Sequence, residues 1–207
     1  MPLTAIAINC SLKPSSGEPS STDRMIGVIG RELGKRNVPL TETIRIADHD
    51  LKPGVESDMG DGDAWPELRR RILAADILIL GGPIWLGQPS SIAKRVLERM
   101  DAFLSETDER SRMPSFGKVA VAAIVGNEDG AHRVTADLFQ ALNDVGWTIP
   151  AGGACYWVGE AMGKTDFKDL PEVPEKVQQT AAMLASNAAH LARLLGQQDY
   201  PGLESKD

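Results

Sequence analysis

The chain has 207 residues, of which 42% are hydrophobic and 25% charged, enough to build the core of one α/β domain. Its formal net charge of -7 argues against a nucleic-acid partner, because phosphate backbones attract basic surfaces. The sequence opens without a basic, apolar leader and has no apolar run near the ~20 residues of a membrane span, so we expect a cytoplasmic protein with no membrane span.

The first half of the chain alternates between strand-like and helix-like patterns. Residues 3–9 form a short apolar run that predicts a strand buried on both faces, and residues 22–35 carry apolar side chains at helical spacing. Residues 38–46 alternate between polar and apolar side chains and predict a second strand. A loop rich in glycine and aspartate follows at residues 48–63, long enough to be a lid or an interface segment. We expect a second helix at residues 64–76, with a proline in its first turn.

The second half continues the same alternation. Residues 76–82 are apolar up to two glycines, as central parallel strands are. The helix that follows can be capped by Ser90 or Ser91. The remaining expected elements are a helix at 89–104, a strand at 117–127, a helix at 129–146, a strand at 147–159 that is interrupted at 150–153, and a long helix at 173–197.

The two cysteines, Cys10 and Cys155, share no CxxC spacing. Two thiols in a chain of this size do not form a disulfide framework, and no histidine accompanies them at the spacing of metal ligands. We expect both to be half-buried core thiols, and we expect no metal site.

Five alternations of strand and helix predict an α/β fold. We expect a flavodoxin-like three-layer sandwich, with a five-stranded parallel sheet in the order 2-1-3-4-5 and helices on both faces. Residues 1–198 would form a single domain, and residues 199–207 a loose C-terminal tail. Ligands of such sheets bind beyond the carboxyl ends of the strands, so the loops after strands one, three and four are the candidates for function.

Hydroxyl side chains crowd the loop after the first strand, "CSLKPSSGEPSST" at residues 10–22. The loop delivers these hydroxyls, backbone N–H groups and one lysine to a helix N-terminus, a combination that favours a phosphate. The candidate phosphate ligands are Ser11, Lys13, Ser20, Ser21 and Thr22. The alternative is a flexible Ser/Pro loop in which Ser21 or Thr22 does no more than cap the helix.

A tryptophan follows the third strand directly, in "PIWLGQP" at residues 83–89. A large aromatic side chain in a stiff, glycine-bounded loop suits a planar ring ligand. The alternative is a tryptophan of the core or of a dimer interface. The candidate residues of this loop are Pro83, Ile84, Trp85, Leu86 and Gly87.

The loop after the fourth strand is "GNEDGAH", whose glycines allow a backbone to approach a ligand closely. Its candidate residues are Asn127, Glu128, Asp129 and Gly130. The alternative is a plain turn in which Asp129 caps the next helix, with His132 a solvated surface residue.

These loops resemble those of the NADPH-dependent FMN reductase family, flavodoxin-like proteins that include quinone and azo-dye reductases. Cys10 to Lys13 and Ser20 to Thr22 resemble the family's "GSxR…SxN" phosphate loop, with cysteine in place of glycine and lysine in place of arginine. Pro83 to Pro89 resembles its "P-x-Y-x-G-x-x-P" loop, with Trp85 in place of tyrosine. The resemblance covers residues 3–153.

The resemblance implies an enzyme that binds FMN and uses NAD(P)H as co-substrate. The hydroxyl-rich loop would hold the FMN phosphate, residues 83–87 would line the isoalloxazine ring and ribityl chain, and residues 127–130 would approach the ring. A hydride from NAD(P)H would pass through the flavin to a small-molecule acceptor such as a quinone or free flavin. Because the flavin carries this chemistry, we name no catalytic side chain.

Two other functions stay open. A flavodoxin-like electron carrier would bind FMN without oxidising NAD(P)H itself, and a flavin-free binding domain can use the same fold. The last helix is rich in small apolar residues, which favours a homodimer or homotetramer, although the same residues can cover the sheet. They are Ala181, Ala182, Ala185, Ala188, Ala189 and Ala192.

A nucleotide-binding P-loop is excluded at "GEAMGKT", residues 159–165. The P-loop motif needs glycine where Val158 stands, and it should open a helix, but two prolines follow soon after. We expect this segment to reach over the flavin or into a partner subunit.

Overall fold

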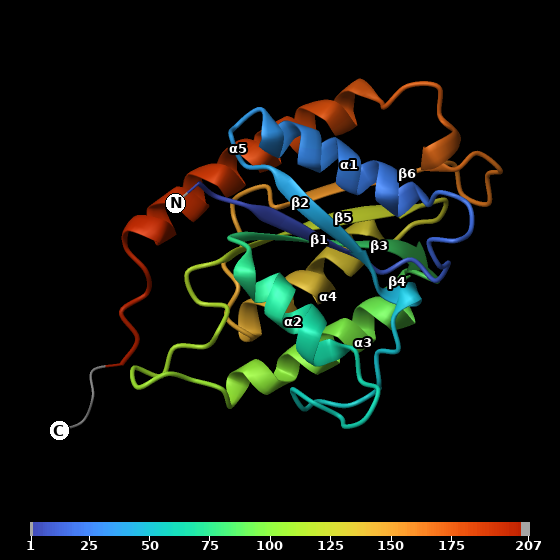
Figure 1. The fold of residues 1–207 in the computed structure, drawn as a ribbon. Coiled ribbons are helices and arrows are strands. Elements are labelled where there is room, and N and C mark those ends of the chain that lie inside the picture. Colours follow the sequence, from blue (N-terminus) through green and yellow to red (C-terminus); the bar gives the residue numbers. More distant parts are fainter. Residues whose placement is uncertain (1, 204–207) are drawn as a thin grey trace.

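A parallel sheet lies between two layers of helices in the computed structural model, which describes residues 2–203 (Figure 1). Its five long strands pair in parallel in the order β2-β1-β3-β5-β6, which confirms the flavodoxin-like sandwich and the predicted strand order. The strands are β1 (Ala5–Asn9), β2 (Leu40–Arg45), β3 (Ile77–Trp85), β4 (Gln88–Pro89), β5 (Val119–Gly126) and β6 (Ala154–Val158).

The short strand β4 makes the sheet six-stranded, where five strands were predicted. β3 continues past Gly82, its predicted end, to Trp85, and β4 turns back to pair Trp85 with Gln88 and Ile84 with Pro89. Two glycines and a proline are typical of a strand end, which is why the sequence conceals this hairpin.

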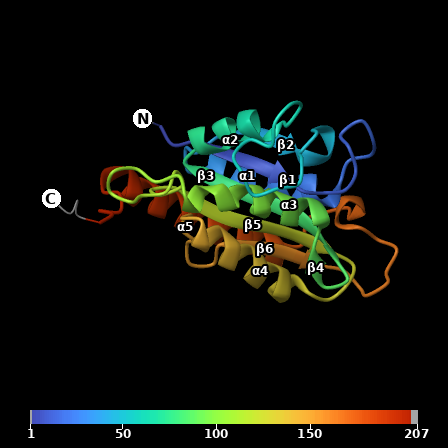
Figure 2. The ribbon, with the colours of Figure 1, turned by 90° about the horizontal axis from the view of Figure 1, so that it is seen from below.

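Two helices cover one face of the sheet and three cover the other. α1 (Ser21–Gly34) and α5 (Glu175–Gln197) lie together on one face. Figure 2 shows the opposite face, with α2 (Trp65–Ala74), α3 (Ser91–Met100) and α4 (Ala131–Asp144). Side chains alternate between the faces along each strand, so Ile8 packs toward α2–α4 and Ala7 toward α1 and α5.

Helix starts explain how the carboxyl edge of the sheet is built. Ser20 caps α1 in a capping box with Asp23, one residue before the capping positions that the sequence analysis weighed. Ser90 caps α3 by accepting from the Ala93 amide, and its hydroxyl donates to the Cys10 carbonyl at 2.7 Å. α4 begins after Gly130, which has no side-chain cap, so the alternative in which Asp129 caps this helix is wrong.

The alanines of α5 face the sheet. Ala181, Ala185, Ala188, Ala189 and Ala192 are buried against α1 and the central strands, and only Ala182 is half-buried. These residues therefore cover the sheet and are not free to bind a second subunit. Among residues 2–203, no helix combines the length and apolar character needed to cross a bilayer.

The loop at residues 48–63 is held by one buried arginine. Arg99, in the last turn of α3, pairs with Asp63 at 2.7 Å, and both side chains are fully buried. Its guanidinium also donates to the backbone carbonyls of Lys52 and Glu56. Burial alone would raise the pKa of Asp63, but hydrogen bonds from Arg99 and two backbone amides lower this pKa to about 2.

Both cysteines are free and fully buried, where half-buried thiols were expected. Burial raises the pKa of Cys155 to about 12 and raises the pKa of Cys10 as well. Neither thiol therefore ionises near neutral pH, and their role is to fill the core.

Residues 199–203, the described part of the expected tail, contact the loop that precedes β5. The Tyr200 ring lies edge-on to Phe116 at 5.5 Å, and its hydroxyl lies 3.0 Å from Thr148 Oγ1. The Leu203 amide donates to the Arg110 carbonyl at 2.8 Å. Residues 204–207, the rest of that segment, lie outside the described residues.

Candidate functional site

The loops that follow β1, β3, β5 and β6 enclose a cavity of about 690 Å³ at the carboxyl edge of the sheet. Eleven of the fourteen predicted site residues line it, so the three loops chosen from the sequence do meet around one space. These residues are Ser11, Lys13, Ser20, Ser21, Thr22, Pro83, Ile84, Trp85, Leu86, Asn127 and Glu128.

One end of the cavity is the N-terminus of α1, where backbone N–H groups lack helical partners. The Ser11 hydroxyl there is buried and has no hydrogen-bond partner among the described residues. Ser20 Oγ accepts from the Asp23 amide at 3.1 Å and from Asn9 Nδ2 at 3.2 Å. Because both acceptor positions of Ser20 are filled, its own hydrogen is left to donate, which suits an anion.

The second loop is the tight hairpin that joins β3 to β4. Leu86 and Gly87 form its two-residue turn with φ values of 52° and 69°, as in the primed turns of hairpins. The Glu128 carboxylate accepts from the amides of Leu86 at 2.9 Å and Gly87 at 3.3 Å. Glu128 thus binds the third loop to the second and holds Trp85 at the cavity wall.

Gly87, Asp129 and Gly130 do not line the cavity. Gly130 has a φ of 125°, and a Cβ atom on it would lie 2.7 Å from the Gly87 Cα. The two glycines therefore allow the second and third loops to touch, and do not themselves approach a ligand from inside the cavity. Asp129 Oδ1 accepts from the Gly130 amide at 2.7 Å and shapes the same turn.

A fourth wall comes from residues 159–170, the crossover segment that joins β6 to α5. It contributes Met162, Gly163, Asp166, Phe167 and Lys168 to the lining. Asn127 Nδ2 donates to Asp166 Oδ1 at 2.8 Å and fixes the segment to the third loop. Of the two positions expected for this stretch, over the flavin or in a partner subunit, its lining of the cavity favours the first.

Arg24 of α1 fixes the other side of the crossover segment. Its guanidinium donates to the carbonyls of Phe167, Lys168 and Leu170 at 2.6–3.0 Å and lies over the Phe167 ring. The Lys168 amide donates to Ser21 Oγ at 3.1 Å, which brings the segment onto the first loop. Contacts between residues ~145 positions apart in the chain therefore close the end of the cavity that lies at the N-terminus of α1.

Lys168 is a cation at this end that the sequence analysis missed. Its Nζ pairs with Asp169 at 3.1 Å and Glu18 at 3.8 Å, and the hydrogen bond to Asp169 raises its pKa. No periodicity marks this irregular segment, so only the fold shows that Lys168 joins Lys13. The other lining residues outside the predicted set are Leu12, Pro19, Val125, Gly126, Trp157, Met162, Gly163, Asp166 and Phe167, of which Trp157 is a sequence-based candidate for a substrate pocket or an interface.

Exposed apolar side chains surround the mouth of the cavity. Leu86 is 91% exposed and Met162 93%, and both have left-handed backbone conformations. Trp85 and Leu12 are about half exposed beside them. Exposed apolar side chains grouped in this way are typical of ligand or protein contacts.

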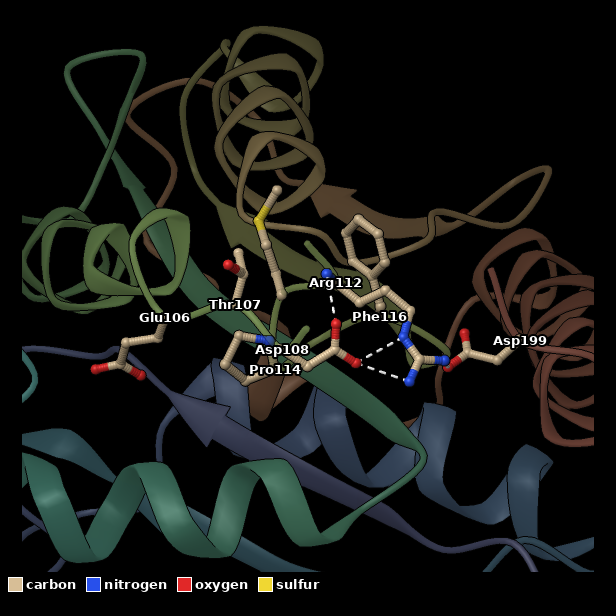
Figure 3. Close-up of a pocket in the computed structure, with 8 residues that line it drawn as sticks. Glu106, Thr107, Asp108, Arg112, Pro114, Phe116 and Asp199 are labelled. Carbon is tan, nitrogen blue, oxygen red and sulfur yellow. Dashed lines mark hydrogen bonds and ion pairs between the residues drawn. The ribbon is translucent and has the colours of Figure 1, made fainter. Parts of the chain in front are cut away.

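A second hollow, of about 510 Å³, lies beside the loop that precedes β5, at the amino end of the strands. Figure 3 shows the residues that line it. The charges of this hollow are paired: Arg112 lies between Asp108 at 2.7 Å and Asp199 at 3.6 Å, and Glu106 pairs with Arg69 of α2. Hydrogen bonds from Arg112 lower the pKa of Asp108 to about 2. None of the predicted site residues lines this hollow.

The chain that forms the cavity of about 690 Å³ matches a known protein family. The NADPH-dependent FMN reductase family matches residues 3–162, from β1 to the crossover segment. The chain belongs to this family. Membership in this family confirms the predicted FMN-binding oxidoreductase, with FMN as cofactor and NAD(P)H as electron donor.

Two relatives differ in how much of their length this chain spans. The 8-demethyl-8-aminoriboflavin-5′-phosphate synthase of Streptomyces davaonensis is 30% identical over 97% of this chain and 81% of its own. The divalent metal cation transporter MntH of Mycobacterium bovis is 37% identical over 93% of this chain. This chain spans only 29% of the transporter's length.

Solved structures agree with the family. The crystal structure of RosB with bound 8-demethyl-8-formylriboflavin-5′-phosphate has a TM-score of 0.84 at 29% identity, covering 96% of this chain and 82% of that one. The apo form of an NADH:FMN oxidoreductase has a TM-score of 0.61 at 20% identity, covering 97% and 95%, and shares the fold.

The residues of the cavity fit FMN. Two buried polar atoms of its lining, Ser11 Oγ and Asn127 Oδ1, have no partner among the described residues, and a polar ligand would satisfy them. Lys13, Lys168 and the start of α1 suit a phosphate, and the Trp85 hairpin suits a flat apolar ring.

Proposed function

We propose that the cavity holds FMN with its phosphate at the N-terminus of α1. The buried, unpartnered hydroxyl of Ser11 carries this proposal, because it stands among helix N–H groups and two lysines. The phosphate ligands would be Ser11, Lys13, Ser20, Ser21 and Thr22. Residues 83–86 would line the ring and ribityl chain, and Asn127 Oδ1 would accept a hydrogen bond from a polar edge of the flavin.

We propose that the three remaining predicted residues act indirectly. Gly87 and Gly130 would let the loops meet, and Asp129 would shape the turn between them. Glu128 would hold the hairpin and so orient Trp85.

When bound, FMN supplies hydride transfer between NAD(P)H and an acceptor. The chain's own residues bind and orient it: the first loop holds the phosphate, and the crossover segment excludes water from that side. The mouth beside Trp85 and Met162 stays open to solvent. We propose that NAD(P)H and a small planar acceptor, such as a quinone or free flavin, use this mouth in turn.

The test is a titration of the purified protein with FMN, followed by NADH and NADPH oxidation with a quinone as acceptor. We expect tight FMN binding and acceptor-dependent oxidation. A protein that binds no flavin would contradict the proposal and favour a flavin-free binding domain. A protein that binds FMN but oxidises neither nucleotide would be an electron carrier.

A second candidate is an enzyme that alters a flavin phosphate as its substrate. The TM-score of 0.84 to a structure with a bound formyl flavin phosphate favours it, since the flavin reductase compared above reaches 0.61. Mass spectrometry of the flavin after turnover separates the two: unchanged FMN supports the reductase, and a flavin of altered mass supports the second candidate.

We propose a homodimer or homotetramer in which exposed apolar side chains at the rim of the mouth, such as Leu86, contact the partner and leave the opening itself to the substrates, since the alanines of α5 are buried against the sheet. Leu86→Asp at the mouth should lower the mass measured by light scattering, and Met183→Asp, on the exposed face of α5, is the matched control. An unchanged mass for Leu86→Asp would contradict this interface. We also propose that residues 1–198 act as one domain, and that the protein works in the cytoplasm, where NAD(P)H is supplied.

A further inference from the structure

A network of polar side chains lies directly behind the first loop. Asn9, the last residue of β1, is fully buried; its Oδ1 accepts from the Ser11 amide at 2.9 Å, and its Nδ2 donates to Asp23 Oδ1 at 2.5 Å. Asp23 Oδ2 accepts from the Ser20 amide at 3.2 Å and pairs with Arg45. The network therefore joins both ends of the first loop to β1 and β2.

Asp23 creates an electrostatic conflict with phosphate binding. It stands in the first turn of α1, where its carboxylate already interacts with the positive end of the helix. A phosphate bound to the same helix end would meet that negative charge at close range, and Asp23 is only one-third exposed, so solvent screens it incompletely.

Arg45 resolves this conflict. It is the last residue of β2, is 9% exposed, and places one guanidinium nitrogen on Asp23. A second nitrogen donates to the Lys13 carbonyl at 2.9 Å. The remaining nitrogen, Nε, is buried and has no acceptor within the described chain. One side chain thus neutralises the competing carboxylate and binds the oxygen of a loop carbonyl that would otherwise be free to face an anion.

We propose that Arg45 is a positioning residue for phosphate recognition. Arg45 binds the Lys13 carbonyl and the Asp23 carboxylate, which are hydrogen-bond acceptors. The first loop is then left with hydrogen-bond donors and positive charge facing a bound phosphate. This inference rests on the proposed FMN site and explains its selectivity. The protein would bind flavins that carry a phosphate more tightly than riboflavin. Arg45 maintains this preference although it does not line the cavity.

The test compares Arg45→Gln with Arg71→Gln. Arg71, on α2, pairs with Glu42, which lies on β2 as Arg45 does. None of the hydrogen bonds that Arg71 makes within residues 2–203 reaches the first loop, so Arg71→Gln is a matched control. Dissociation constants for FMN and riboflavin are measured by quenching of flavin fluorescence. We expect Arg45→Gln to weaken FMN binding roughly 10- to 100-fold and to leave riboflavin binding within about twofold. Arg71→Gln should change neither.

A second variant separates electrostatics from loop damage. In Asp23→Asn/Arg45→Gln the carboxylate that Arg45 neutralises is gone, so FMN affinity should recover by about tenfold over Arg45→Gln alone. If Arg45→Gln fails to fold, the inference is decided by Asp23→Asn against the double variant, which should then differ less than about threefold in FMN affinity.

The outcomes are distinguishable. A wild-type protein that binds no FMN overturns the proposed function. A wild-type protein that binds FMN, with Arg45→Gln binding it equally well, overturns only the role of Arg45. Equal losses for FMN and riboflavin, with no recovery in the double variant, also overturn it, because they mark a purely structural residue.

Discussion

Both ends of the strands are hollowed, but only the hollow at the carboxyl end is lined by buried polar atoms without partners in the described chain. At the amino edge, Arg112, Asp108 and Asp199 pair with one another (Figure 3). At the carboxyl edge, Ser11 and Asn127 keep buried polar atoms without partners in the described chain, and apolar side chains are exposed around the mouth. Because the two hollows differ more in the chemistry of their lining than in volume, the unsatisfied lining groups are the reason to propose the binding site at the carboxyl end.

Charges that pair within the fold away from the first loop should affect stability alone. The strongest case is Arg99→Ala, which leaves Asp63 buried without its partner and should lower the free energy of unfolding by about 3–5 kcal/mol. Urea unfolding measures it, with the exposed Arg110→Ala as control. A loss below about 1 kcal/mol would show that loop 48–63 is not held by this pair.

The same pair predicts a pH dependence. The pKa of Asp63 is lowered to about 2, so its contribution is fully present above the unfolded value of about 4 and is lost as the pH falls toward 2. Asp63→Asn should be less stable than the wild type at pH 7, and the difference should shrink at pH 3. A difference that is constant with pH would contradict the assignment.

At the carboxyl edge, changes should affect binding and leave stability intact. Lys13→Ala should weaken FMN binding by about 1–3 kcal/mol, because it removes a charge-assisted contact, and should not affect riboflavin. Lys176→Ala, an exposed lysine on α5, is the control. Equal FMN affinity of Lys13→Ala and wild type would remove Lys13 from the site.

Trp85→Ala tests the other part of the cavity, where the flavin ring and not the phosphate is expected to bind. The hairpin is expected to contact the ring, so this variant should weaken FMN and riboflavin alike, by about 1 kcal/mol each. Titration of both flavins checks it. A loss confined to FMN would place the phosphate, and not the ring, beside Trp85.

The smallest effect is expected at the paired hollow. Arg112→Ala removes exposed ion pairs and should leave FMN affinity unchanged and the unfolding midpoint nearly so. Altered flavin binding in this variant would break the comparison between the two edges.

More of the fold than of the candidate site could be predicted from the sequence. Apolar runs such as residues 76–82 predicted the parallel strands, because burial on both faces leaves a strong pattern, and their order was expected from the flavodoxin-like fold that five alternations suit. The β3–β4 hairpin was hidden by its glycines and proline, and Lys168 by an irregular segment without periodicity. Arg45 was unrecognisable because its role depends on Asp23, which only the fold brings beside it.

The hydrogen bonds from Arg24 to the crossover segment also determine when, during synthesis, the site can form. Its acceptors, the carbonyls of Phe167, Lys168 and Leu170, come from the last quarter of the chain, whereas Arg24 and the first loop are made at the start of synthesis. Chains emerge at about 5–20 residues per second, so α1 waits several seconds for its partner. We therefore expect the nascent protein to acquire its cofactor only after the chain is nearly complete.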